Sequence, residues 1–153
     1  MSEDAQAAEN QPPLAINGQF IKDLSFEAPH VPEIFADMAN GNGPAIGIDV
    51  DVKAAQLHAN MYEVDLLLKV EAKAGEKVAF LVELEFCGIV TLNVAEEHIQ
   101  PMLFIEVPRH LFPFARAVIA STTRDAGFPP LMIAPIDFVD MFRQRMGEPQ
   151  GEA

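Results

Sequence analysis

Two glutamates and a lone cysteine in segment 78–87 are the side chains best suited to chemistry in this sequence. Glu83 and Glu85 lie two residues apart in a run that alternates between apolar and polar positions. If that run is a strand, both carboxylates lie on one face, about 7 Å apart, and two carboxylates can act as general acid and base. Cys87 would be a nucleophile if a histidine lay beside it. Because nothing in the sequence predicts a cleft here, a solvated sheet face explains the glutamates better, and apolar packing explains Cys87 better.

Motifs for metals, nucleotides and serine hydrolases are missing from the sequence. The four histidines show no HxH or HExxH spacing of a metal site. They are His30, His58, His98 and His110. Neither GxGxxG nor GxxxxGK(S/T) occurs, the GNG sequence at 41–43 lacks the lysine of a phosphate-binding loop, and Ser121 has no GxSxG frame. We therefore predict no catalytic residue, no metal and no cofactor.

The composition combines a large apolar content with a strong negative charge. The chain of 153 residues is 50% hydrophobic, contains 11 Phe and 7 Met, and carries a formal charge of −13. This length and apolar content predict one domain with a substantial core. The charge disfavours nucleic acid and anionic membranes, which bind basic patches, and it favours cationic partners. It also allows a protein with exposed apolar surface to stay soluble.

The ends of the chain and its single cysteine bear on location. Residues 1–14 are polar and acidic, without the basic start and apolar middle of a signal peptide, and no run of about eighteen apolar residues occurs. Cys87 has no partner for an intrachain disulfide. We expect a disordered acidic leader over 1–14, one domain over 15–146, a flexible acidic tail over 147–153, and a cytoplasmic location.

Four alternating runs predict β-strands, because successive side chains of a strand point to opposite faces. These runs are 20–27, 45–52, 62–72 and 78–86, and the last could continue to Asn93 past a bend or bulge at Gly88. The turn sequence at 74–77 makes 62–86 a hairpin. The segment 53–60 reads as a polar connection. The segment 28–44 is long for a hairpin, so it either crosses to a non-adjacent strand or covers a groove.

The period of the pattern changes in the second half of the chain, where helices are predicted. The segment 96–107 is ambiguous and could hold a short helix that ends before Pro108. A longer helix is predicted over 111–126, with Pro113 in its first turn and Gly127 just past its end.

A last helix is predicted over 138–146, with Asp137 as its N-cap. Four of its residues have the 3–4 spacing of one helix face. Three of them are apolar, Phe138, Met141 and Phe142, and the fourth is Arg145. Strands followed by helices predict an α+β domain with an antiparallel sheet.

The alternation predicts two surfaces. In the first run Phe20, Leu24 and Phe26 share one side, while Asp23 and Glu27 share the other. The acidic surface consists of Asp23 and Glu27 from the first run together with three residues of the fourth run, which are Leu81, Glu83 and Glu85. The apolar surface takes in the second run and the last helix. Two or three short helices cannot cover both faces of a sheet, so the remaining apolar area predicts an oligomer interface, a binding groove or both.

Three blocks of the sequence resemble the SecB family of bacterial protein-export chaperones, and they occur in the family's order. They are KDLSFEAP at 22–29, AFLVE at 79–83 followed by Gly88-Ile89, and LFPFAR at 111–116 followed by GFPPL at 127–131 and APIDF at 134–138. The first block is the most specific, and the resemblance runs from about Ile16 to Met146.

The resemblance implies a fold and an assembly. The family's fold is a four-stranded antiparallel sheet with two main C-terminal helices packed on one face, and four chains assemble as a dimer of dimers. The side of the fourth run that would meet the helices and the subunit partner consists of Val82, Leu84 and Phe86. The tail GEPQGEA is shorter than the family's SecA-contacting tail, which predicts a weaker second contact with SecA.

The resemblance also implies a function, which is holding unfolded precursor proteins in an apolar groove and delivering them to the motor SecA without using ATP. The residues implied to dock SecA are Asp23, Glu27, Leu81 and Glu83. Those implied to line the client groove are Phe26, Ile46, Ile48, Val50, Phe138, Met141 and Phe142.

Three other functions remain open at this point. The chain could be a SecB-like chaperone dedicated to one partner, such as an unstable antitoxin. It could be a small enzyme that uses Glu83 and Glu85 or Cys87, in which case convergent polar groups with shifted pKa values are expected in a pocket. It could also be a purely structural oligomer, which predicts no client binding.

Overall fold

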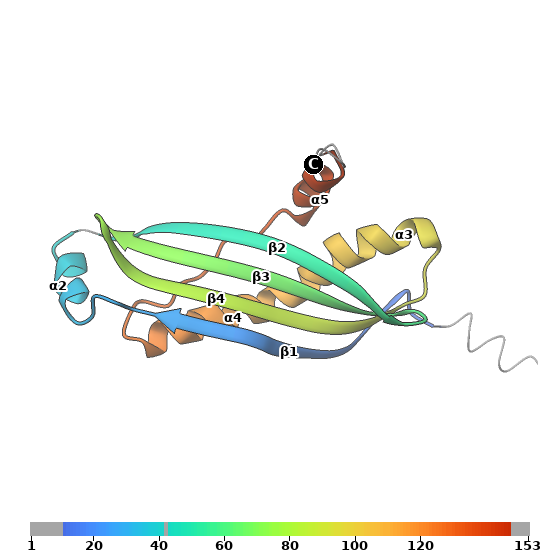
Figure 1. Ribbon diagram of the computed structural model, residues 1–153, viewed down its shortest axis with the longest axis horizontal. Coiled ribbons are helices and arrows are strands. Elements are labelled where there is room, and N and C mark those ends of the chain that lie inside the picture. The colour runs from blue at the N-terminus through green and yellow to red at the C-terminus, as the bar shows by residue number, and fades with distance from the viewer. Residues whose placement is uncertain (1–10, 42, 148–153) are drawn as a thin grey trace, which may run out of the picture.

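A long four-stranded antiparallel sheet forms the body of the protein in the computed structural model, which describes residues 11–41 and 43–147. The strands are β1 (Leu14–Glu27), β2 (Ala45–His58), β3 (Met61–Ala74) and β4 (Lys77–Leu92). Their order across the sheet is β1-β4-β3-β2, with helices on one side of it (Figure 1). The predicted α+β class and the four antiparallel strands are confirmed.

The segment between β1 and β2 is the crossover that one of the two sequence interpretations predicted. These strands follow each other in the chain but form opposite edges of the sheet. The connection carries α2 (Glu33–Ala39), which lies beyond the end of the strands in Figure 1. Ile34 anchors this helix because its side chain is fully buried.

The strands are longer than the alternating runs predicted. β1 begins at Leu14, and β2 continues to His58, so the predicted polar connection over 53–60 is wrong. Polar side chains do not end β2 because an edge strand with one solvated face accommodates them. The turn from β2 to β3 is only Ala59 and Asn60, whereas the predicted turn from β3 to β4 is confirmed, with Gly75 at φ +65°.

A bulge in β1 reverses the predicted alternation of that strand. Ile21 pairs with Phe86 and Asp23 with Glu85, so Lys22 is left out of the pairing. One extra residue moves the side chains before it to the other face, here as far back as a second irregularity between Ile16 and Gly18. Phe20 therefore lies on the face opposite Leu24 and Phe26, not beside them as the sequence pattern predicted.

The helical part of the chain is a continuous run from residue 96 to residue 125. It consists of α3 (Glu96–Pro101), the π-helical segment η1 (Met102–Glu106) and α4 (Val107–Asp125). The predicted helix end before Pro108 is wrong, because this proline lies in the first turn of α4, where its missing N–H costs little. Pro113 lies inside α4 rather than in a first turn.

The core lies between α4 and the inner face of the sheet, over β3 and β4. Leu111 of α4 is fully buried and lies directly above Gly88, where a Cβ would approach Leu111 Cδ2 to 2.9 Å. This close approach explains the glycine, since β4 pairs with β3 in continuous register past it and shows no bend or bulge there. Gly127, at φ +96°, ends the helical segment as predicted.

The last helix, α5 (Phe138–Gly147), begins as predicted and projects beyond the β2 edge of the sheet (Figure 1). The Asp137 carboxylate accepts a hydrogen bond from the Asp140 amide at 3.0 Å, which is the expected cap. In the described part of the chain, α4 packs on β3 and β4, and η1 contacts β2. No helix in the described ranges 11–41 and 43–147 is long and apolar enough to cross a membrane.

Candidate binding surfaces

A groove separates β2 from α5 on the helix-bearing side of the sheet. α4 covers the central strands and leaves the inner face of β2 partly bare, so Ile46 and Ile48 are 38% and 39% exposed. The groove has a volume of about 660 Å³. Its walls come from β2, η1 and α5, and its lining residues are Ile48, Val50, Asp51, Val52, Phe104, Met141, Phe142, Gln144 and Arg145.

The structure brings together four of the seven side chains that were expected to line a client groove. Ile48 and Val50 form the β2 wall, while Met141 and Phe142 form the α5 wall. Ile46 lies next to this groove, in a depression of about 580 Å³ that Ile48 also lines.

The other two expected groove residues lie elsewhere. Phe26 stacks on Phe80, with ring centroids 5.9 Å apart, in an aromatic cluster that also includes Phe128. Phe138 is only 2% exposed and packs edge-on against Phe112, so it is a core residue and not a groove residue. Phe138 is the first residue of α5, and its burial attaches that helix to α4.

Phe104 and Arg145 line the groove but were not among the predicted site residues. The Arg145 guanidinium lies 4.4 Å from the centroid of the Phe104 ring, and its Nη1 donates to the Val52 carbonyl at 2.9 Å. The signal for Arg145 was its place in the 3–4 stripe of the last helix. Phe104 lies in the stretch whose pattern was ambiguous, and only the π-helical path of η1 directs it at the groove.

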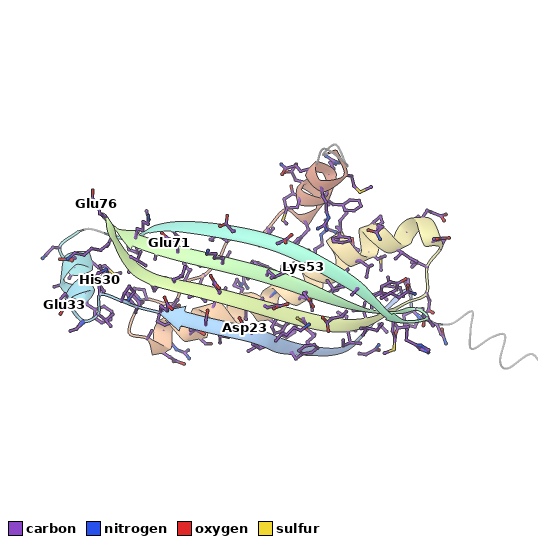
Figure 2. All side chains as sticks on the ribbon, in the orientation of Figure 1. Asp23, His30, Glu33, Lys53, Glu71 and Glu76 are labelled. Carbon is purple, nitrogen blue, oxygen red and sulfur yellow. The ribbon has the colours of Figure 1, made fainter. Side chains whose placement is uncertain are left out.

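The opposite, outer face of the sheet carries an acidic patch, which we define as Asp23, Glu27, Leu81, Glu83 and Glu85. The register places Asp23 beside Glu85 and Glu27 beside Leu81, on the two adjacent strands β1 and β4. The four residues expected to dock SecA are therefore neighbours on one face. This face is turned to the viewer in Figure 2, where Asp23 is labelled.

The acidic patch is left largely uncompensated. Like charges placed directly across a sheet repel each other, as Asp23 and Glu85 do here. Lys69 Nζ lies 3.7 Å from Glu83 Oε1, but both side chains are about half exposed and the pair is therefore weak. A shallow depression of about 290 Å³ next to the patch adds two more carboxylates from β2, Asp49 and Asp51. The electrostatic potential of this face favours a cationic partner.

The residues expected at a subunit interface are buried within a single chain. Val82, Leu84 and Phe86 are 0%, 3% and 6% exposed. β4 is a central strand, and the inner face that carries these side chains lies under α4. Because they are buried within the chain, these side chains present no surface to a partner subunit.

Four residues form a polar cluster on the outer face, and they are the described residues whose pKa values are shifted. They are Lys22, Glu63, Asp65 and Cys87. Lys22 Nζ lies 2.8 Å from Glu63 Oε2, which lowers the pKa of the Glu63 carboxyl and raises the pKa of Lys22. Burial raises the pKa of the Asp65 carboxyl. Burial and the neighbouring Asp65 raise the pKa of the Cys87 thiol well above its usual range.

This polar cluster does not support the enzyme interpretation. A catalytic cysteine needs a lowered pKa, whereas the pKa of Cys87 is raised and its side chain is fully buried. Glu63, Asp65 and Cys87 place possible metal ligands within 4.8 Å of one another, but the Lys22 ammonium already supplies a positive charge to Glu63. Glu83 and Glu85 lie on the solvated outer face of the sheet, where Glu85 adds to the negative charge that raises the pKa of Cys87.

Comparison with known proteins relates the whole chain to one family. Residues 7–149 match the family model described as "Preprotein translocase subunit SecB". The protein-export protein SecB of Rhodospirillum rubrum is 48% identical over 151 residues, which cover 99% of this chain and 93% of that protein. The protein-export protein SecB of Paramagnetospirillum magneticum is 50% identical over 154 residues, with 98% and 99% coverage.

A solved structure shows the same fold at low sequence identity. It is described as the Mycobacterium tuberculosis Rv1957 SecB-like chaperone in complex with a ChAD peptide from the Rv1956 HigA1 antitoxin. The TM-score is 0.68 at 13% identity, over 86% of this chain and 95% of that chain. The matching family model and the two relatives show that this chain belongs to the SecB family of protein-export chaperones.

Proposed function

We propose that this chain holds unfolded precursor proteins in the groove between β2 and α5 and delivers them to the motor SecA, in the cytoplasm and without using ATP. The observation that carries the proposal is the separation of two surfaces on one sheet. The apolar groove lies on the helix-bearing side, and the acidic patch lies on the outer side. A client and a cationic docking partner can therefore bind the same chain at once.

The chemistry of the groove suits clients that share no sequence. Such clients can be recognised only by burial of apolar surface, which contributes about 25 cal/mol per Å² before ordering costs. Met141 is flexible, and the stacked rings of Phe104 and Phe142 offer flat contact area, with centroids 6.3 Å apart. These side chains can repack around different segments.

We also propose that four chains assemble as a dimer of dimers, as the family resemblance implies. Because Val82, Leu84 and Phe86 are buried within the chain, the contact between subunits has to use other apolar surface. Edge strand β1 supplies Ile21 and Leu24, which are 46% and 39% exposed, and α4 supplies Phe114, which is 53% exposed.

The holding function is tested by light scattering on a size-exclusion column, with the protein alone and with a reduced and alkylated polypeptide that cannot fold. The native form of that polypeptide is the control. We expect a tetramer-sized peak that gains mass only with the unfolded form. A peak that gains no mass with either form would overturn the proposed function.

The docking assignment is tested by Glu83→Lys, with Glu76→Lys as the matched control. Both variants change the charge equally, but Glu76 lies in the β3–β4 turn, away from the patch (Figure 2). We expect Glu83→Lys to weaken SecA binding about tenfold or more, since a reversed charge in a docking face is repulsive, while client binding stays unchanged. Equal SecA affinities for the two variants, measured by titration calorimetry, would remove the acidic patch from the docking site.

A chaperone dedicated to a single partner, such as an antitoxin, is the alternative. The fold neighbour described above was solved with an antitoxin peptide, but at 13% identity it supports only the shared fold. Affinity purification from cells distinguishes the two functions, because an export chaperone should retain many precursor proteins and a dedicated one should retain one.

A further inference from the structure

β2 has one edge without a neighbouring strand, and at one residue of this open edge two side chains bind the main chain. β2 pairs with β3 along one side only. The Val52 amide donates to Asp51 Oδ1 at 2.9 Å, and the Val52 carbonyl accepts from Arg145 Nη1 at 2.9 Å. Arg145 Nη1 also lies 3.9 Å from Asp51 Oδ1. We call this pair the Asp51–Arg145 clasp. Both main-chain groups of Val52 bind side chains instead of a neighbouring strand, so Val52 faces the open edge.

The residues that face this edge are also the residues that line the groove. Every second residue of a strand directs its main-chain groups to the same edge and its side chain to the same face. The pairing of β2 with β3 is regular from Ala45 to Gln56. Ile48 and Val50 therefore share both the edge and the groove with Val52. One extended segment can add main-chain hydrogen bonds to β2 while its alternate side chains enter the groove.

The outer side of the same edge is acidic. Asp49 and Asp51 alternate with the groove residues, and both are exposed. A strand added to β2 places its remaining side chains beside these carboxylates, and opposite charges on neighbouring strands stabilise the pairing. The chemistry of the edge thus fits a segment in which apolar residues alternate with Lys or Arg.

We propose that an extended segment of unfolded polypeptide, with apolar and basic residues in alternation, adds to the open edge of β2 and displaces the Asp51–Arg145 clasp. The clasp closes this edge in the free protein. It is weak enough to be displaced, because the Asp51 and Arg145 side chains are 61% and 51% exposed, while the Phe104 ring keeps the arginine in place. The proposal rests on the proposed client function of the groove and specifies how a client is held.

The first experiment uses a synthetic peptide in which Val and Lys alternate, and two N-methylated forms of it. One form carries methyl groups on the Val amides, and the other carries them on the Lys amides. In antiparallel addition the amides of the groove-facing residues point at β2, so methylation of Val should weaken binding about tenfold or more, while methylation of Lys has little effect. A loss confined to the Lys form would support the same proposal with parallel addition. Equal affinities of the two forms, measured by fluorescence anisotropy, would overturn it.

The second experiment tests the clasp with Arg145→Ala, and Arg143→Ala is the matched control. Both residues are exposed on α5, and both changes remove one positive charge. We expect Arg145→Ala to bind the unmodified peptide about fivefold more tightly, because the segment no longer competes with one hydrogen bond of ordinary net strength. An affinity equal to that of Arg143→Ala would overturn the clasp. Arg145→Gln serves if the alanine variant does not fold.

Three further outcomes separate this inference from other possibilities. If Arg145→Ala enlarges the assembly in light scattering and leaves peptide affinity unchanged, the open edge binds a second copy of this chain, and the proposal is wrong. If the protein binds alkylated polypeptide but treats all peptides alike, only the strand-addition inference fails. If the protein does not bind alkylated polypeptide, the proposed function fails as well.

Discussion

Gly88 shows how one missing side chain sets the distance between a helix and the sheet. A Cβ at this position would lie 2.9 Å from Cδ2 of Leu111, which is fully buried and cannot move away freely. We expect Gly88→Ala to lower the free energy of unfolding by about 1–3 kcal/mol, as overpacked cores do. Gly18→Ala, with no atom within 4 Å of the added Cβ, is the control in urea unfolding. Equal losses in both variants would show that α4 is not held at this distance by Gly88.

Asp65 should make stability depend on pH in an unusual direction. Burial raises the pKa of its carboxyl in the folded protein, so the folded state binds this proton more tightly than the unfolded state does. The folded state is therefore favoured most below the ordinary aspartate pKa of about 4. This stabilising contribution is lost as the pH rises from that value to the higher folded pKa, and it stays lost above it.

Asp65→Asn tests this dependence because it removes the buried charge. We expect the variant to be more stable than the unmodified protein at neutral pH, with the difference shrinking as the pH falls toward about 4 and constant below that value. Thermal unfolding across this pH range measures it, and Asp49→Asn, an exposed position on the same face, is the control. A variant that is less stable at neutral pH would show that the Lys22 and Cys87 contacts outweigh the cost of burial.

At the scale of elements, α5 is attached at its first residue and exposes a binding face beyond it. Phe138→Ala should lower the free energy of unfolding by about 3–5 kcal/mol, because a buried aromatic ring leaves a cavity. Phe142→Ser should lower it by no more than about 2 kcal/mol and should weaken client binding, since this side chain lines the groove. Urea unfolding and binding of alkylated polypeptide measure the two effects. The reverse pattern would contradict the assignment of these two residues.

At the scale of the whole molecule, the described helices cover the centre of the sheet and part of β2, and apolar surface remains on both edge strands. Replacing Ile21 and Leu24 with lysine should reduce the size of the assembly, because two charges would enter the proposed contact along β1. Light scattering measures the size, and circular dichroism verifies the fold. Met132→Lys is the control, at a position that is 61% exposed and outside β1. An unchanged assembly would move the subunit contact away from β1.

The strands, the fold class and the family could be predicted from the sequence because they depend on local patterns. Alternation with a period of two identified all four strands, and the oxygen of Asp137 caps the last helix as its position predicted. The grouping of Asp23, Glu27 and Glu83 came from the family resemblance, and it follows from strand pairing once the register is known.

Only the tertiary structure decided which of these side chains are accessible and which of them meet. The bulge at Lys22 reverses the side of Phe20, and no pattern within the strand reveals it, because a bulge arises from pairing with β4. Val82 and Phe138 became core residues because α4 and α5 pack where long-range contacts place them. The clasp of Asp51 and Arg145 joins residues 94 positions apart, and contacts at such a separation form only when the whole chain has folded.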